Sequence, residues 1–80
     1  MKLMERVKAT MRVKRYSLRT EKTYCYWIRF YIRFNNLRHP ATLTGHEVRQ
    51  FLEYLAIERH VAAATQNQAL NAIVLLYRHV

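Results

Sequence analysis

The chain has 80 residues, 51% of them hydrophobic, so it can form one small domain around a modest core. One glycine and one proline are too few for the many turns of a β fold, and the residues that dominate the chain favour helices. Fourteen lysine and arginine residues against five acidic ones give a net charge of +9, which indicates a polyanionic partner: nucleic acid first, an anionic membrane surface second.

The first helix is expected over residues 2–14. Hydrophobic residues recur there at helical spacing and form one stripe that would pack inward: Leu3, Met4, Val7 and Met11. Basic residues surround this stripe, namely Lys2, Arg6, Lys8 and Arg12.

The second helix is expected over residues 18–35, with Ser17 as its N-cap. Steps of three and four residues predict two opposite faces. The face that would pack inward carries Tyr24, Trp27, Ile28, Tyr31 and Phe34. The face that would present charge carries Lys22, Tyr26, Arg29 and Arg33.

A connector is expected over residues 35–44. The pair Asn35-Asn36 is typical of a helix end. Pro40 cannot continue a helix and favours an extended backbone at His39.

The third helix is expected over residues 45–59, behind a capping box in which Thr44 and Glu47 bond each other's backbone amides. Its predicted core face consists of Val48, Phe51, Leu52 and Leu55. Three of the five acids lie on this helix (Glu47, Glu53 and Glu58), so we expect it to turn away from a polyanion.

The fourth helix is expected from residue 63 to the end of the chain. Its first turns are polar, whereas residues 69–77 are hydrophobic nearly all round and predict burial on more than one side. Because such a helix runs to the last residue, we expect the natural protein to continue.

The sequence lacks the usual patterns of metal sites and active sites. The four histidines are scattered and Cys25 is the only cysteine, so no metal, cofactor or internal disulfide is expected. There is no aspartate, no glycine-rich phosphate loop and no combination of serine, histidine and acid. Each tyrosine either has core spacing or lacks a neighbouring base. No signal peptide or membrane span is visible, which predicts a cytoplasmic chain.

Two polar clusters remain as candidate DNA contacts. At the entry to the second helix, free amides and the helix dipole would favour a phosphate, and the basic face continues along the helix. This first cluster comprises Arg15, Arg19, Thr20, Lys22 and Thr23, followed by Arg29 and Arg33. The second cluster opens the fourth helix with side chains that can bond adenine edges or phosphates: Thr65, Gln66, Asn67 and Gln68.

Several runs from Tyr16 onward form a recognisable pattern in order and spacing: YSLRTEKTY (16–24), WIRFYI (27–32), RHP (38–40), Val48 with Phe51-Leu52, AAATQNQAL (62–70) and LLYR (75–78). Together they resemble the N-terminal domain of tyrosine recombinases of the integron-integrase and phage-integrase type.

This resemblance implies an all-α, four-helix SAM-like bundle, the core-binding domain, spanning residues 1–80. With a C-terminal catalytic domain absent from this chain, it would form a clamp around a recombination site of double-stranded DNA. The second and fourth helices would face the major groove, while other helices would contact neighbouring subunits in a tetramer of the full-length chain. The nucleophilic tyrosine would belong to the missing domain, so the chain itself would not be an enzyme. It would act on the bacterial nucleoid.

Two other functions stay open on the residues alone. One is a basic membrane-surface or partner-binding module that uses the aromatic face of the second helix. The other is a stand-alone helix-turn-helix regulator that uses the third and fourth helices, although the acids of the third weaken it.

Overall fold

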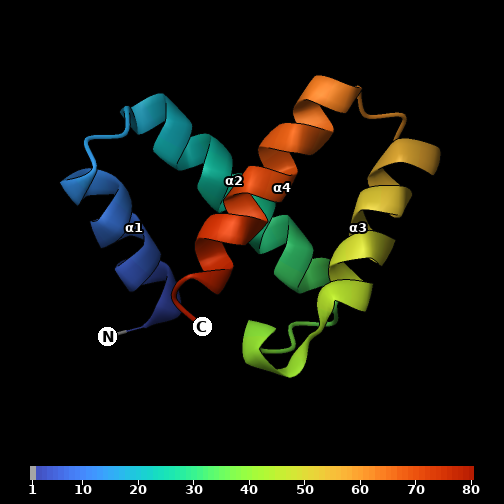
Figure 1. Cartoon of the computed structure of the whole chain (residues 1–80), viewed down its shortest axis with the longest axis horizontal. Coiled ribbons are helices and arrows are strands. Elements are labelled where there is room, and N and C mark those ends of the chain that lie inside the picture. Colours follow the sequence, from blue (N-terminus) through green and yellow to red (C-terminus); the bar gives the residue numbers. More distant parts are fainter. Residues whose placement is uncertain (1) are drawn as a thin grey trace.

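The computed structural model describes residues 2–80 and is built from four α-helices with short connections (Figure 1). The helices are α1 (Leu3–Val13), α2 (Leu18–Phe34), α3 (Gly45–Ile57) and α4 (Ala63–Tyr77), and a 3₁₀ turn, η1, covers Pro40–Thr42. No strand occurs among the described residues. The expected all-α, four-helix architecture is therefore confirmed. No helix within residues 2–80 has both the length and the apolar character needed to cross a membrane.

The central feature of the fold is the crossing of α4 over α2 (Figure 1). α1 packs against α2 on one side of the crossing, and α3 packs against α4 on the other. The molecule measures 35 × 27 × 16 Å, so it is thin in the direction in which α2 and α4 are stacked. The first turns of α2 and α4 lie at the upper edge of Figure 1, while both chain ends lie toward the lower edge.

The caps predicted for α2 and α3 are confirmed. The sequence alone could predict them because each cap depends only on neighbouring residues. The Ser17 hydroxyl accepts a hydrogen bond from the Thr20 amide at 3.1 Å. At α3, the Glu47 carboxylate accepts from the Thr44 amide at 3.1 Å, and the Thr44 hydroxyl accepts from the His46 amide at 3.2 Å. The Thr44 hydroxyl also bonds the Glu47 carboxylate and holds the pKa of Glu47 below its ordinary value. This contribution to stability is present above the ordinary glutamate pKa and is lost as the pH falls through the lowered one.

The helix crossing is held by a buried chain of hydroxyl groups. Tyr31 of α2 is fully buried, and its hydroxyl lies 2.9 Å from that of Tyr77 on α4. The Tyr77 hydroxyl donates to the Pro40 carbonyl at 3.0 Å, so the Tyr31 hydroxyl is the donor to Tyr77. α2, α4 and the turn η1 are therefore linked at one point. Burial and the bond to Tyr77 both raise the pKa of Tyr31, which stays protonated.

Aromatic rings fix α3 to α2. The ring of Phe51 on α3 packs in tilted or edge-on contact with three rings of α2, those of Phe30, Tyr31 and Phe34, at centroid distances of 5.3–5.4 Å. The guanidinium of Arg59 lies over the Phe30 ring at 5.4 Å. Offset and edge-on ring pairs stabilise beyond the area they bury. The hydrophobic stripe of α2 is therefore core, as its spacing predicts.

The fourth helix ends earlier than expected, at Tyr77 rather than at the last residue. The His79 amide turns back to the Leu76 carbonyl at 3.0 Å, and the Arg6 guanidinium donates to the His79 carbonyl at 2.5 Å. This contact ties the end of the chain to α1. The connector also differs from the expectation, since it contains the turn η1, whose Ala41 amide donates to the His39 imidazole at 3.0 Å.

Removing either tyrosine hydroxyl of this chain should lower the free energy of unfolding, but by different amounts. Tyr77→Phe leaves the buried Tyr31 hydroxyl without a partner, while the Pro40 carbonyl keeps its bond from the Leu43 amide. It should lower the free energy of unfolding by about 2 kcal/mol. Tyr31→Phe leaves the bond from Tyr77 to Pro40 intact and should cost about 1 kcal/mol. Urea unfolding followed by circular dichroism measures both; equal costs for the two variants would contradict this ordering.

Candidate nucleic-acid interface

The N-terminal ends of α2 and α4 lie at the same edge of the molecule (Figure 1). We call this the N-terminal edge, formed by residues 15–23 and 63–68. The first amides of a helix have no partners within it and carry a partial positive charge, which favours an anion. At α4 the N-cap is Ala62, which has no side chain to bond these amides. The crossing thus brings both predicted clusters to one edge, although they are about 40 residues apart in the chain.

The threonines of the first cluster differ in the hydrogen bonds they can still make. The Thr20 hydroxyl accepts from Ser17 at 2.9 Å, so its own proton remains available to a phosphate. The Thr23 hydroxyl donates to the Arg19 carbonyl at 2.9 Å, so only its lone pairs remain. The side chains of Arg19 and Lys22 are exposed. Of the two threonines, Thr20 is therefore better suited to bind an anion.

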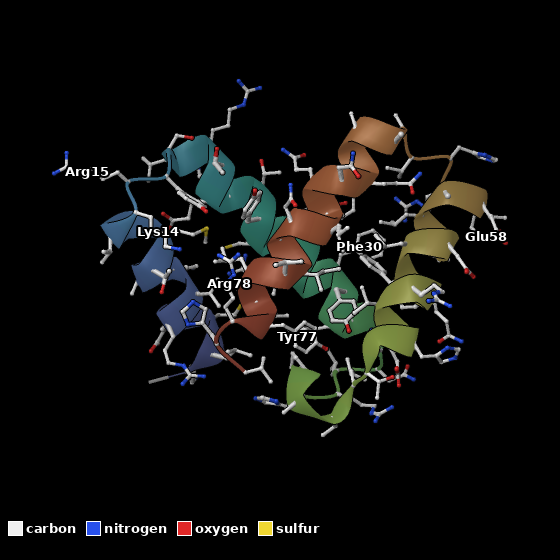
Figure 2. The ribbon with its side chains drawn as sticks, viewed as in Figure 1. Lys14, Arg15, Phe30, Glu58, Tyr77 and Arg78 are labelled. Atoms are coloured by element: carbon white, nitrogen blue, oxygen red, sulfur yellow. The ribbon has the colours of Figure 1, made fainter. Side chains whose placement is uncertain are left out.

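Arg15 occupies a backbone conformation that glycine adopts at lower cost. It follows the C-terminus of α1 with φ at 60°. The Tyr16 amide bonds the Met11 carbonyl at 2.9 Å, and the Arg15 amide bonds that of Arg12 at 3.0 Å, which is the Schellman arrangement. Most such helix ends carry glycine, because a Cβ atom strains the left-handed region. Here the position carries an exposed guanidinium instead, which projects from the outer corner of the molecule beside Lys14 (Figure 2).

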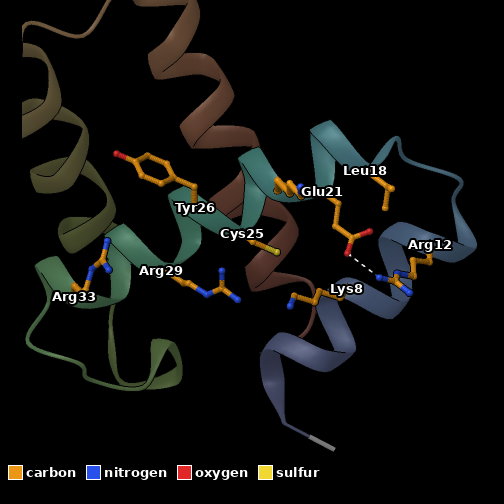
Figure 3. Close-up of a pocket in the computed structure, with 9 residues that line it drawn as sticks. Lys8, Arg12, Leu18, Glu21, Cys25, Tyr26, Arg29 and Arg33 are labelled. Atoms are coloured by element: carbon orange, nitrogen blue, oxygen red, sulfur yellow. Dashed lines mark hydrogen bonds and ion pairs between the residues drawn. The ribbon is translucent and has the colours of Figure 1, made fainter.

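The basic row of α2 consists of Lys22, Arg29 and Arg33, and the last two lie on the side of α2 that faces away from α4 (Figure 3). Lys22, Arg29 and Arg33 are exposed, as expected, and line a groove of about 570 Å³ between α1 and α2. Two cationic residues of α1, Lys8 and Arg12, line the same groove. Both are among the basic residues that surround the hydrophobic stripe of α1 in the sequence. Nothing in the sequence shows, however, that α1 packs beside the basic row of α2. They are not among the predicted contacts.

The second cluster is only partly exposed. Asn67 and Gln68 are exposed at the start of α4, whereas Thr65 and Gln66 are half-buried. The side-chain amide of Gln66 donates to the Val61 carbonyl at 3.0 Å, and Gln66 also lines a hollow beside α3. Asn67 and Gln68 are therefore the members of this cluster best placed to reach a base edge.

The acidic residues on α3 and at its C-cap do not line the α1–α2 groove. Glu58 lies at the outer side of α3, at the opposite end of the molecule from Arg15 (Figure 2). The α1–α2 groove contains one carboxylate, that of Glu21, which is 7% exposed and 3.4 Å from the Arg12 guanidinium. The face between α1 and α2 therefore has a strongly positive potential.

Within residues 2–80 no group of three or more potential metal-ligating side chains comes together. Burial raises the pKa of Cys25, although the nearby cations Lys8 and Arg29 act in the opposite direction. The thiol of Cys25 therefore stays protonated at neutral pH.

Comparisons with known proteins agree on one family. The family described as "Phage integrase, N-terminal SAM-like domain" matches residues 3–80. Proteins named "Integrase/recombinase" from Escherichia coli and Pseudomonas aeruginosa are each 46% identical to this chain over 79 residues. The match covers 99% of this chain and 23% of each relative, so the chain spans about a quarter of their length.

The cap of α2 sets the stability of the N-terminal edge. Ser17→Ala removes the acceptor of the Thr20 amide and should lower the free energy of unfolding by about 1 kcal/mol. Ser17→Gly, the matched control, lets water reach the amide and should cost only about 0.3 kcal/mol. Urea unfolding measures both, and an alanine variant as stable as the glycine variant would show that this hydrogen bond contributes little.

Proposed function

The chain belongs to the family of phage integrase N-terminal SAM-like domains, and we propose that it binds duplex DNA for a site-specific tyrosine recombinase. The observation that carries the proposal is the arrangement of positive charge. The crossing brings the first turns of α2 and α4 to one edge. A row of exposed cations continues along α2. The acids on α3 and at its C-cap do not line the groove beside this row.

The proposed contacts divide into two kinds. Lysine and arginine side chains would supply most of the affinity by binding phosphates, which fixes the orientation of the protein without reading sequence. Amide side chains at the start of α4, those of Asn67 and Gln68, would add a modest preference for adenine edges. The Thr20 hydroxyl, with its free proton, suits a phosphate at the first turn of α2.

The same proposal extends to the whole recombinase. The nucleophilic tyrosine and the residues that assist it would lie in a catalytic domain outside these 80 residues. The two domains would close around the recombination site, and subunit contacts would form only in a tetramer of full-length chains. The protein would act in the bacterial cytoplasm, on the nucleoid.

A membrane-surface function is less well supported. It requires the aromatic face of α2, but Trp27 is 7% exposed and stacks against Phe30 within the bundle. Unfolding part of the core would be needed to present this face to lipid.

The basic row predicts a strong salt dependence of DNA binding. If about six phosphates are neutralised, log K should fall with log salt at a slope near −5. The double variant Arg29→Ala with Arg33→Ala should weaken binding to all sequences and flatten the slope by about 2. The control, Arg38→Ala with Arg49→Ala, changes the net charge equally on the connector and α3 and should leave the slope unaltered. Fluorescence anisotropy with labelled duplexes measures this. Equal slopes for the two double variants would exclude the α2 row as the contact surface.

Replacing Arg15 should have opposite effects on the stability of the protein and on its binding to DNA. Arg15→Gly relieves the left-handed backbone and should raise the free energy of unfolding by about 0.5–1 kcal/mol. It also removes one proposed phosphate contact and should reduce the salt slope by about 0.9. Leu37, which is exposed and has φ at 62°, offers the control. Leu37→Gly should stabilise the fold and leave DNA binding unchanged. If the two variants bind DNA alike, Arg15 is no DNA contact.

A further inference from the structure

The groove between α1 and α2 combines positive charge from both of its walls (Figure 3). Five cationic side chains and one carboxylate line it: Lys8, Arg12, Lys22, Arg29, Arg33 and Glu21. Along α2, Lys22, Arg29 and Arg33 follow at steps of seven and four residues, which is one stripe about 16 Å long at 1.5 Å per residue. Each strand of B-DNA carries one phosphate per about 3.4 Å of helix axis, so the stripe is long enough to follow several phosphates.

The packing of α1 gives the groove its second wall. Val7 and Met11 are fully buried, and each is followed directly by a cation, Lys8 and Arg12. Residues four apart lie on the same side of a helix, so both cations face the same groove. α1 is held in this position at both ends, by the bond from Arg6 to His79 and by the ion pair between Arg12 and Glu21.

The ion pair leaves Arg12 free to bind a further anion. One guanidinium nitrogen lies 3.4 Å from Glu21 Oε1, while the Arg12 side chain is 69% exposed. A guanidinium has five N–H donors, so most remain available to a phosphate. The Glu21 side chain is 9% exposed, so its carboxylate makes little direct contact with a ligand, although its charge still lowers the positive potential of the groove. Glu21 thus holds Arg12 beside the α2 row.

We propose that this groove binds the phosphate backbone of DNA, with Lys8 and Arg12 of α1 as contacts in addition to the α2 row. The inference rests on the proposed function, since it assumes that duplex DNA is the polyanion. Its distinctive claim is that α1 is part of the DNA-binding surface. An anionic membrane would not explain why the cations are arranged as two facing walls.

The test measures the affinity of the chain for labelled duplex DNA across a range of salt concentrations. Lys8→Gln should flatten the slope of log K against log salt by about 0.9, and Lys8→Gln with Arg12→Gln by about 2. Glu21→Gln should raise the affinity, because it removes negative charge from the groove while its amide oxygen can still accept a bond from Arg12. Arg49→Gln, exposed on α3, changes the net charge as Lys8→Gln does and should leave the slope unchanged.

Thermal unfolding of each variant separates loss of contact from loss of fold. Lys8→Gln keeps the pair between Arg12 and Glu21 intact, so it decides the question if the double variant does not fold. Unchanged slopes for the Lys8 variants, while the Arg29 and Arg33 variant flattens the slope, would overturn the role of α1 and leave the proposed function standing. If the original chain shows no salt-dependent binding to duplex DNA, the proposed function fails and this inference with it. Lys8 variants that bind phosphatidylserine vesicles less well but DNA equally well would assign the groove to lipid and overturn the proposal.

Discussion

The hydrogen bond between Tyr31 and Tyr77 ties the last turn of α4 to α2 inside the core. A buried hydroxyl must find a partner, and the Tyr31 hydroxyl reaches its partner only when α4 passes directly over it. Tyr77 in turn reaches the Pro40 carbonyl, which fixes the path of the connector below the crossing. Hydrophobic contact alone tolerates some sliding of one helix along the other, whereas this chain of hydroxyls is complete in only one arrangement and so favours one register. The position of both helix N-termini at one edge follows from that register (Figure 1).

Positive and negative charges are also separated in the fold, because the flanking helices α1 and α3 carry different side chains on their outer surfaces. α3 packs through aromatic rings and carries acids on its outer surface, where Glu58 lies (Figure 2). α1 packs through Val7 and Met11 and places its cations next to those of α2. A molecule 16 Å thick cannot screen one surface from another by distance alone, so this segregation is what produces a strongly positive side.

Much of the fold could be predicted from the sequence because the relevant signals are local. Ser17 and Thr44 cap residues three or fewer positions away, and the spacing of Trp27, Ile28 and Tyr31 defines a core face within one helix. What could not be predicted depends on which helices become neighbours. The approach of Lys8 to the α2 row is such a feature. The bond from the Gln66 side chain to the Val61 carbonyl, which occupies one predicted contact, depends instead on the backbone path before α4, which helical spacing does not define. The DNA-contact residues themselves remain predictions.

The bond from Arg6 to the His79 carbonyl has a consequence for how the chain can be attached to anything else. It brings α1 and the end of the chain together at the lower edge of Figure 1, away from the N-terminal edge. A fluorophore, a surface tether or a polypeptide linker joined at either end would therefore leave from the edge opposite the N-terminal edge. It would leave the first turns of α2 and α4 uncovered.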